Sequence, residues 1–289
     1  MTTIKRDVAL TFAGGGNRAF YVMGLLARWD EVLLPRTAVV ASCSAGACVI
    51  TTYLSGRRSE AREYWLSRVR GITRNFDWSK LLRGERAAPQ GAIYRDTLLV
   101  TFADGGLERI RQQPFPIYVL AASLPPWLPA TLSAALGIGL YSAERTLKRG
   151  PHPRLPGLLG FGPVAVDART CETPEDLANL ILASSATPPF TPIGAFRGQQ
   201  LLDGGMVDNA PAFVAERHPG VSRSIVLLTR PYHPSVLGVQ GPRLYLAPTR
   251  PTPINRWDYT QPHLLDDTIA MGEQEAAIHR DVLDRYLAG

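Results

Sequence analysis

Residues 37–47 read TAVVASCSAGA, and this stretch decides the fold. Its first half is a continuous apolar run typical of a buried strand, and its second half is a cluster of small residues around Ser44. An apolar helical pattern follows, with Ala47, Val49, Ile50, Tyr53 and Leu54. A serine held between a strand and a helix by small neighbours is typical of a nucleophile elbow, in which the turn pushes the serine Oγ clear of the backbone. Taken alone, the cluster is also consistent with an ordinary tight turn.

The same alternation of strand and helix begins further upstream. Residues 8–12, VALTF, read as a buried strand, and the glycines at 14–16 mark a turn. Apolar side chains then recur at helical spacing from Phe20 to Trp29. Two strand–helix units in succession predict a parallel sheet with helices on its faces. We expect further strands at 117–121, 224–228 and 244–246, and a helix at 264–287 that packs through Leu265, Ile269, Ala276, Ile278, Leu283 and Leu287.

Composition is that of an ordinary globular protein, because 45% of the 289 residues are hydrophobic and 19% are charged. The N-terminal residues show no secretory signal. Three cysteines, Cys43, Cys48 and Cys171, stand in no C-x-x-C or Cys/His pattern, so we expect neither a disulfide framework nor a metal site. These features predict a cytoplasmic location.

The net charge of +6 is unevenly distributed along the chain. Residues 57–95 contain ten Arg or Lys and four Asp or Glu, whereas residues 266–285 contain six acidic and two basic residues. The simpler interpretation is a general preference for arginine on solvated helical faces. A basic face for anionic lipid headgroups is the alternative. Nucleic acid is not an expected partner, since no recognisable reading motif accompanies the charge.

Residues 124–163 differ from the rest of the chain. A Pro-Pro-Trp sequence at 125–127 leads into a nearly continuous apolar run over 128–141, which Arg145, Lys148 and Arg149 follow. The run is too short to span a bilayer, which needs about 20 residues. It is consistent with a buried core helix, or with a lid or interfacial helix that dips into lipid.

Ester hydrolysis through a serine also needs donors for the oxyanion and a base. Gly14, Gly15 and Gly16 stand between a strand and a helix, where backbone N–H groups can converge on an anion, and Arg18 adds positive charge. The same glycines fit the dinucleotide pattern G-x-G-x-x-A. However, the second strand does not end in the carboxylate that this pattern requires.

Two kinds of base are compatible with the sequence. Asp203 begins an Asp-Gly-Gly sequence after an apolar pair, so it is a candidate at the lip of a sheet, although such a sequence often marks only a turn. Alternatively, a histidine after the aspartate completes a triad in the order Ser, Asp, His. The candidates for that histidine are His218, His233, His263 and His279.

Together these segments resemble the patatin-like phospholipase family over roughly residues 7–230. The G-G-G-x-R-G motif of the family appears as GGGNRA at 14–19, and its G-x-S-x-G motif as SCSAG at 42–46. A proline-bearing segment is matched by ASSATPPF at 183–190, and the D-G-G/A motif by Asp203 and the two glycines after it. The motifs also agree in their order and spacing.

The resemblance implies a three-layer α/β/α sandwich with a mainly parallel central sheet, forming a single domain over 1–289 that carries the insertion at 124–163. It further implies a lipid acyl hydrolase that uses a Ser44–Asp203 dyad without histidine and forms an acyl-enzyme. The amides of Gly15 and Gly16, with Arg18, would frame the oxyanion. No cofactor or metal is implied, the partner is a lipid or membrane-surface substrate, and the protein is expected in the cytoplasm, peripherally at that surface. The oligomeric state is not indicated.

Two residues depart from the family pattern. Ser42 replaces the first glycine of the elbow motif, and Ala19 replaces the last glycine of the first motif. A position that needs a positive φ tolerates serine or alanine poorly. The departures therefore leave open a lipid-binding or regulatory module with weakened chemistry. An acyltransferase is a further alternative, because it shares the acyl-enzyme.

Overall fold

The strands predicted from the sequence form the centre of one sheet, and shorter strands extend its edges. The computed structural model describes residues 4–77, 79–80, 83, 88–147, 150–153 and 155–289. Within these residues nine strands form a sheet in the order β5-β6-β3-β2-β1-β7-β9-β8, with β4 paired to β3 beside this path. The strands are β1 (Val8–Phe12), β2 (Thr37–Cys43), β3 (Ile117–Ser123), β4 (Gly162–Asp167), β5 (Gly194–Phe196), β6 (Gln199–Asp203), β7 (Arg223–Leu227), β8 (Gly238–Gln240) and β9 (Arg243–Leu246).

Helices connect these strands and cover the sheet. The α-helices are α1 (Phe20–Leu33), α2 (Ala45–Leu54), α3 (Arg58–Val69), α5 (Gln90–Phe102), α6 (Gly106–Arg111), α7 (Ala130–Leu147), α8 (Leu155–Leu158), α9 (Pro174–Ser184), α10 (Ala212–Ala215) and α11 (His263–Ala288). Single 3₁₀ turns are η1 (Gly16–Ala19), η2 (Leu34–Arg36), η3 (Ala168–Thr170), η4 (Gly204–Met206) and η5 (Pro234–Val236).

The parallel centre of the sheet explains the continuous apolar runs of the sequence. β1 pairs in parallel with β2 on one side and with β7 on the other, and β1 and β2 are buried along their whole length. Parallel strands covered on both faces have no polar face, so their side chains do not alternate. Phe12 pairs with Ser42, and the turns after β1 and β2 therefore leave the sheet at the same edge.

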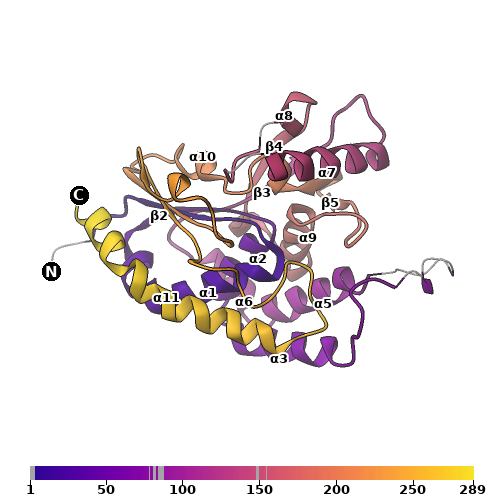
Figure 1. Cartoon of the computed structure of the whole chain (residues 1–289), viewed down its shortest axis with the longest axis horizontal. Coiled ribbons are helices and arrows are strands. Elements are labelled where there is room, and N and C mark those ends of the chain that lie inside the picture. Colours follow the sequence, from indigo (N-terminus) through magenta and orange to yellow (C-terminus); the bar gives the residue numbers. More distant parts are fainter. Residues whose placement is uncertain (1–3, 78, 81–82, 84–87, 148–149, 154) are drawn as a thin grey trace.

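Helices lie on both faces of the sheet, which confirms the α/β sandwich (Figure 1). α1 and α11 run along one face, and the short helix α10 covers the centre of the other. The contact between α1 and α11 is close, because a Cβ on Gly24 would collide with the carbonyl oxygen of Ile269, and one on Gly272 with that of Tyr21. The glycine pair therefore brings the two helix backbones together.

The helix predicted at 264–287 is confirmed as α11, but one of its predicted packing residues is not buried. Leu265, Ala276 and Leu283 are buried as expected, but Ile278 is 64% exposed. Residues two apart in a helix do not share a face. Ile278 therefore points to solvent when Ala276 points into the core, and its assignment as a packing position is wrong.

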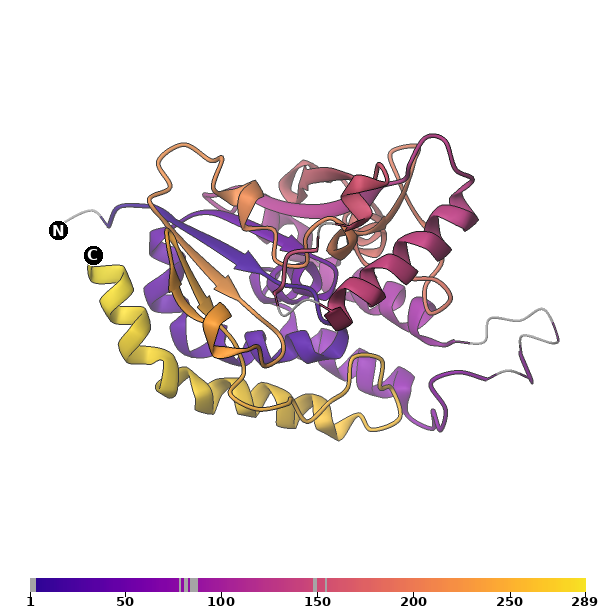
Figure 2. The ribbon, with the colours of Figure 1, turned by 45° about the horizontal axis from the view of Figure 1, so that its top comes forward.

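The inserted segment between β3 and β4 forms α7 and α8 at the periphery of the molecule (Figure 2). The alternative of a buried core helix is wrong, because Leu132 and Leu136 of α7 are 56% and 38% exposed. The opposite face of α7, with Ser133 and Ala134, is buried. Of the basic residues expected near its end, Lys148 and Arg149 lie outside the described residues, as do 78, 81–82 and 84–87 of the basic stretch 57–95.

None of the helices in the described part of the chain combines the length and the hydropathy of a membrane-spanning segment.

Candidate active site

Ser44 occupies the tight turn between β2 and α2. Its backbone has a φ of 51° and a ψ of −131°, a conformation that is uncommon for a residue with a side chain. Its carbonyl oxygen accepts the N–H groups of Ala47 at 3.0 Å and Cys48 at 3.3 Å, so the turn leads directly into α2. A Cβ on Gly46 would collide with the carbonyl oxygen of Phe12, which explains why the small residue two positions after Ser44 is needed. The turn has the strained geometry of a nucleophile elbow.

The two departures from the family motifs lie in ordinary backbone conformations. Ser42 is part of β2, and its hydroxyl donates to the carbonyl oxygen of Tyr118 at 3.1 Å. Ala19 has a φ of −66° and a ψ of −18°, which is helical. Neither residue is among those with a positive φ. A glycine is therefore not required by the backbone at either position.

Asp203 lies close to Ser44 because the strands that precede these two residues, β6 and β2, both pair with β3. β3 pairs with β2 on one side and with β6 on the other, and Asp203 is the last residue of β6. The Ser44 hydroxyl donates to Oδ2 of Asp203 at 2.8 Å, and the Gly205 N–H donates to Oδ1 at 2.7 Å. A Cβ on Gly204 would collide with the carbonyl oxygen of Leu120. The Asp-Gly-Gly sequence thus folds closely onto β3 and holds one carboxylate oxygen, while the other faces Ser44.

Burial sets the protonation behaviour of this carboxyl group. Asp203 is only 3% exposed, and desolvation raises its pKa above the ordinary value of 3.8. The positive charge of Arg256, the N–H of Gly205 and the hydroxyl of Ser44 lower the pKa and oppose this effect. The raised pKa makes Asp203 a stronger proton acceptor than an exposed aspartate.

Ser184, which was not among the predicted site residues, holds the backbone of the turn at Ser44. Its hydroxyl donates to the carbonyl oxygen of Leu120 at 2.6 Å and accepts the N–H of Ser44 at 2.8 Å. Ser184 lies in the proline-bearing segment 183–190, where nothing in the sequence distinguishes it from Ser185. Its role follows only from the placement of α9 beside β3.

The glycine turn offers two backbone donors rather than three. The N–H of Gly14 donates to the carbonyl oxygen of Asn209 at 2.9 Å, so it is engaged within the protein. Among the described residues, none accepts the N–H groups of Gly15 and Gly16. Gly16 has a φ of 59°, and a Cβ there would collide with the carbonyl oxygen of Arg256. The two free amides at positions 15 and 16 are the donors that remain for an anion.

Arg18 supports this turn. Its Nε donates to the carbonyl oxygen of Gly15 at 3.1 Å. The carbonyl oxygen of Gly14 accepts the hydroxyl of Thr229 at 2.8 Å and the side-chain amide of Asn209 at 3.2 Å. The turn is therefore braced by three side chains.

The histidines lie elsewhere. His233 contacts Ser235, His279 contacts Ala247 and Tyr21, and His218 and His263 have no side-chain hydrogen bond with any described residue. His152, which the sequence did not single out, is bound to Asp208 and Tyr245. None of these five rings is hydrogen-bonded to Ser44 or to Asp203.

Ser44 faces an apolar cavity of about 310 Å³, a size typical of ligand pockets. The walls come from α1, α2, α3, α5 and α11, and they include Phe20, Met23, Trp65, Tyr94 and Ile269. The cavity thus runs from the nucleophile into the helical layer that α1 and α11 form.

Arg256 is a second residue of the site, after Ser184, that no feature of the sequence selects. It lies between β9 and α11, lines the apolar cavity together with Ser44, and lowers the pKa of Asp203 through its charge. Its carbonyl oxygen accepts the N–H of Asn17 at 3.1 Å, so the backbone of this segment is tied to η1. No motif surrounds Arg256, and its position depends on a segment more than 200 residues away from the turn that it contacts.

No group of three or more His, Cys, Asp or Glu side chains in the described part of the chain is placed to hold a metal ion.

The motifs that meet at this site can be compared with those of known proteins. The sequence model of the patatin-like phospholipases matches residues 10–216, which is more than half of the chain. The chain belongs to the patatin-like phospholipase family. The part of it that matches the patatin-like sequence model includes the glycine turn, Ser44 and Asp203, and membership supports lipid hydrolase activity in general terms.

Two solved structures resemble this patatin-like chain at 12% identity. VipD from Legionella pneumophila aligns with a TM-score of 0.45 over 98% of this chain and 67% of its own. Human GIVD cytosolic phospholipase A2 aligns with a TM-score of 0.41 over 98% of this chain and 63% of its own. A comparison with curated proteins gave no match.

Proposed function

We propose that this protein hydrolyses acyl esters of lipids with Ser44 as the nucleophile and Asp203 as the base. The observation that carries the proposal is the 2.8 Å hydrogen bond from the Ser44 hydroxyl to Asp203, at a strained turn that faces an apolar cavity. A serine hydroxyl is a weak nucleophile unless an adjacent base takes its proton. The cavity offers apolar space for an acyl chain next to that hydroxyl.

The reaction proceeds in two stages. Ser44 Oγ attacks the carbonyl carbon of the ester while Asp203 takes the hydroxyl proton. The tetrahedral intermediate collapses, the bond to the alcohol breaks, and Asp203 returns the proton to the leaving oxygen. Water then attacks the acyl-enzyme with Asp203 again as the base, which releases the fatty acid and restores Ser44.

Donors for the developing oxyanion are the amides of Gly15 and Gly16. No residue that the structure describes accepts their N–H groups, whereas the N–H of Gly14 donates to the carbonyl oxygen of Asn209. Each fixed donor of this kind contributes roughly 100- to 1000-fold to the rate of acyl transfer. Arg18 contributes by holding the carbonyl of Gly15 and adds positive charge beside the turn.

The backbone at the two departures from the family motifs favours the hydrolase over a weakened lipid-binding module. That alternative rests on the departures at Ser42 and Ala19, and both residues adopt backbone conformations that any residue tolerates. An active hydrolase should release free fatty acid from at least one lipid of a panel of phospholipids and neutral lipids. It should also be labelled by a fluorophosphonate at Ser44, and lipid binding without labelling or release would support the module instead.

The pKa of Asp203 predicts how the activity depends on pH. Asp203 must be ionised to act as a base, and its pKa is raised by burial, so kcat/KM should fall at a higher pH than for an ordinary aspartate. Replacing Arg256 with glutamine removes a charge that lowers this pKa. The acidic limb of the profile should therefore move to higher pH in Arg256→Gln. Profiles of kcat/KM for an uncharged ester, with exposed Arg250→Gln as the control, measure the shift, and an unmoved limb would contradict the prediction.

We further propose that α7 and its flanks contact the lipid surface. Trp127, Leu132, Leu136 and Leu158 are 61%, 56%, 38% and 80% exposed. Large apolar side chains gathered on one exposed segment mark interaction surfaces, and Trp is favoured at the boundary between lipid and water. This placement supports the interfacial alternative for residues 124–163.

The double variant Leu132→Glu/Leu136→Glu should bind lipid vesicles at least about tenfold more weakly, because each leucine loses its transfer into the acyl layer. Sedimentation with anionic vesicles measures the binding. Ile278→Glu is the matched control, since it changes an equally exposed apolar residue on α11. Equal loss in both proteins would show that α7 is not the contact.

A further inference from the structure

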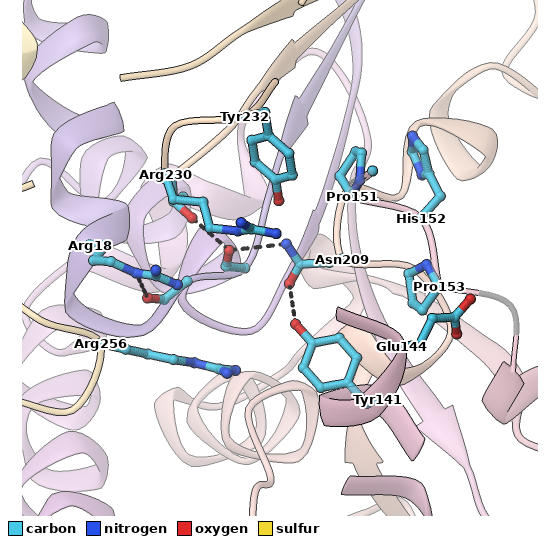
Figure 3. A pocket seen from close by; sticks show the side chains of 14 residues that line it. Arg18, Tyr141, Glu144, Pro151, His152, Pro153, Asn209, Arg230, Tyr232 and Arg256 are labelled. Atoms are coloured by element: carbon cyan, nitrogen blue, oxygen red, sulfur yellow. Dashed lines mark hydrogen bonds between the residues drawn. The ribbon is translucent and has the colours of Figure 1, made fainter. Parts of the chain in front are cut away.

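A second cavity lies on the other side of the glycine turn, and arginines dominate it (Figure 3). Arg18 enters it from η1, Arg230 from the segment after β7, and Arg256 from the segment before α11. The three side chains point into the cavity from the same side, toward Asn209. Segments far apart in the sequence thus bring three positive charges together.

Two of these arginines have no carboxylate in direct contact within the described part of the chain, although the charge of Arg256 acts on Asp203 at longer range. Arg230 lies over the ring of Tyr232 at 4.1 Å, and Arg256 lies near the rings of Trp257 at 5.0 Å and Tyr141 at 5.9 Å. Neither forms an ion pair or a side-chain hydrogen bond with a described residue. Moreover, Nε of Arg256 is buried without an acceptor. Buried donors are nearly always satisfied, so an unsatisfied guanidinium nitrogen indicates a missing anionic or polar ligand.

The acidic groups near the cavity are already engaged. Glu144 lies at the opposite side of the cavity, where its Oε2 accepts the N–H of Leu155 at 2.8 Å. Asp208 is bound to His152 at 2.8 Å and accepts the N–H of Ala210 at 2.9 Å. The side that holds the arginines therefore keeps an excess of positive charge.

The space in front of these arginines is small. Only about 20 Å³ is open to the centre of a water molecule, which admits about one compact group. Guanidinium groups match the oxygens of phosphate in pairs, and several of them favour a phosphate that carries two negative charges.

The two cavities are arranged to hold one ligand. Gly14 and Gly15 line the arginine cavity, Gly16 and Ser44 line the apolar cavity, and Arg256 lines both. An ester carbonyl at Ser44 would therefore lie between the apolar cavity, which has room for an acyl chain, and the arginine cavity, which has room for an anionic group.

We propose that the arginine cavity binds the terminal phosphate of the substrate, and that Arg230 and Arg256 select acyl esters of glycerol phosphate over uncharged acylglycerols. This inference rests on the proposed hydrolase function. It adds a specificity determinant outside the four motifs, because neither arginine belongs to them.

The test compares kcat/KM for an acylglycerol phosphate with that for the monoacylglycerol of the same chain. The ratio of the two cancels any loss of catalytic power that is common to both substrates. We expect the native protein to favour the phosphate ester at least about tenfold. Arg230→Gln and Arg256→Gln should each lower the ratio about tenfold or more, since a charge-assisted pair of hydrogen bonds is lost. Arg250→Gln, exposed on the same segment as Arg256, should leave the ratio unchanged.

Binding to the Ser44→Ala protein gives a second readout that does not need turnover. Quenching of tryptophan fluorescence should show tighter binding of the acylglycerol phosphate than of the monoacylglycerol, and Arg230→Gln should remove the difference. Equal binding of the two ligands by Ser44→Ala would overturn the inference. So would a ratio of kcat/KM that stays at the native value in both arginine variants. Inorganic phosphate that inhibits both substrates equally, with no discrimination between them, would identify a free-anion site instead of a headgroup site. Absence of turnover with intact discrimination in binding would contradict the hydrolase proposal alone.

Discussion

Ser44→Ala should abolish acyl-ester hydrolysis, with kcat reduced by about 10⁴-fold or more. Removing a serine nucleophile leaves only the contributions of substrate binding and oxyanion donors, and such variants lose several orders of magnitude in rate. The substitution removes one oxygen from a residue whose backbone is held by Ser184 and by α2, so the turn should persist. Fatty-acid release from a short-chain p-nitrophenyl ester and from lipid substrates measures the effect.

The control for Ser44→Ala is Ser55→Ala. Ser55 is fully buried at the end of α2, where its hydroxyl donates to the carbonyl oxygen of Thr52, but it does not line the cavities. The Ser55→Ala variant tests whether the loss of a buried hydroxyl near α2 is by itself enough to lower the rate of fatty-acid release. Turnover by Ser44→Ala that equals the native rate would refute the assignment of the nucleophile.

Asp203→Asn should reduce kcat by about 10³- to 10⁴-fold, because the amide cannot take the proton of Ser44. An asparagine keeps an oxygen for the N–H of Gly205, so the turn after β6 is preserved. His233→Ala should retain native turnover, since that ring contacts only Ser235 in the described structure. The reverse result, an active Asp203→Asn and an inactive His233→Ala, would favour a histidine triad.

The same variant should be more stable at neutral pH. A carboxyl whose pKa is raised on folding stabilises the native state only while it is protonated, and this contribution is lost as the pH rises through the raised pKa. The ionised, buried Asp203 therefore destabilises the fold where the enzyme works, and asparagine removes that effect. The Tm of Asp203→Asn should exceed that of the native protein at neutral pH, and the difference should vanish below the ordinary aspartate pKa of 3.8.

The parallel centre of the fold could be predicted because its signals are local. The strands β1, β2, β3, β7 and β9 are buried apolar runs, and the glycines and small residues between them mark turns. The antiparallel strands β5 and β8 have only three residues each, and β6 begins with two glutamines, so their sequences do not distinguish a short edge strand from a loop. α7 was ambiguous because its apolar residues lie on both its buried and its exposed face.

The candidate site likewise contains residues that the sequence predicts and residues that it does not. Ser44, Asp203 and the glycine turn are marked by short motifs, because each needs a particular backbone shape. Ser184 and Arg256 act through single side chains placed by distant elements, and no local pattern identifies such residues. The hydrogen bond from the Gly14 N–H to the carbonyl oxygen of Asn209 likewise joins residues that are 195 positions apart in the sequence, so only the folded structure reveals it.

The contact of α1 with α11 through Gly24 and Gly272 has a consequence for how the protein can diverge. The family match ends at residue 216, yet Arg256 and Ile269, which line the apolar cavity, come from beyond it. Ser44 and Asp203 are thus encoded in a different region of the gene from part of the wall of the apolar cavity. Substitutions beyond residue 250 can change the shape of this cavity while Ser44 and Asp203 stay in place. The glycine pair keeps the backbone of α11 in close contact with α1 when other side chains of α11 are replaced.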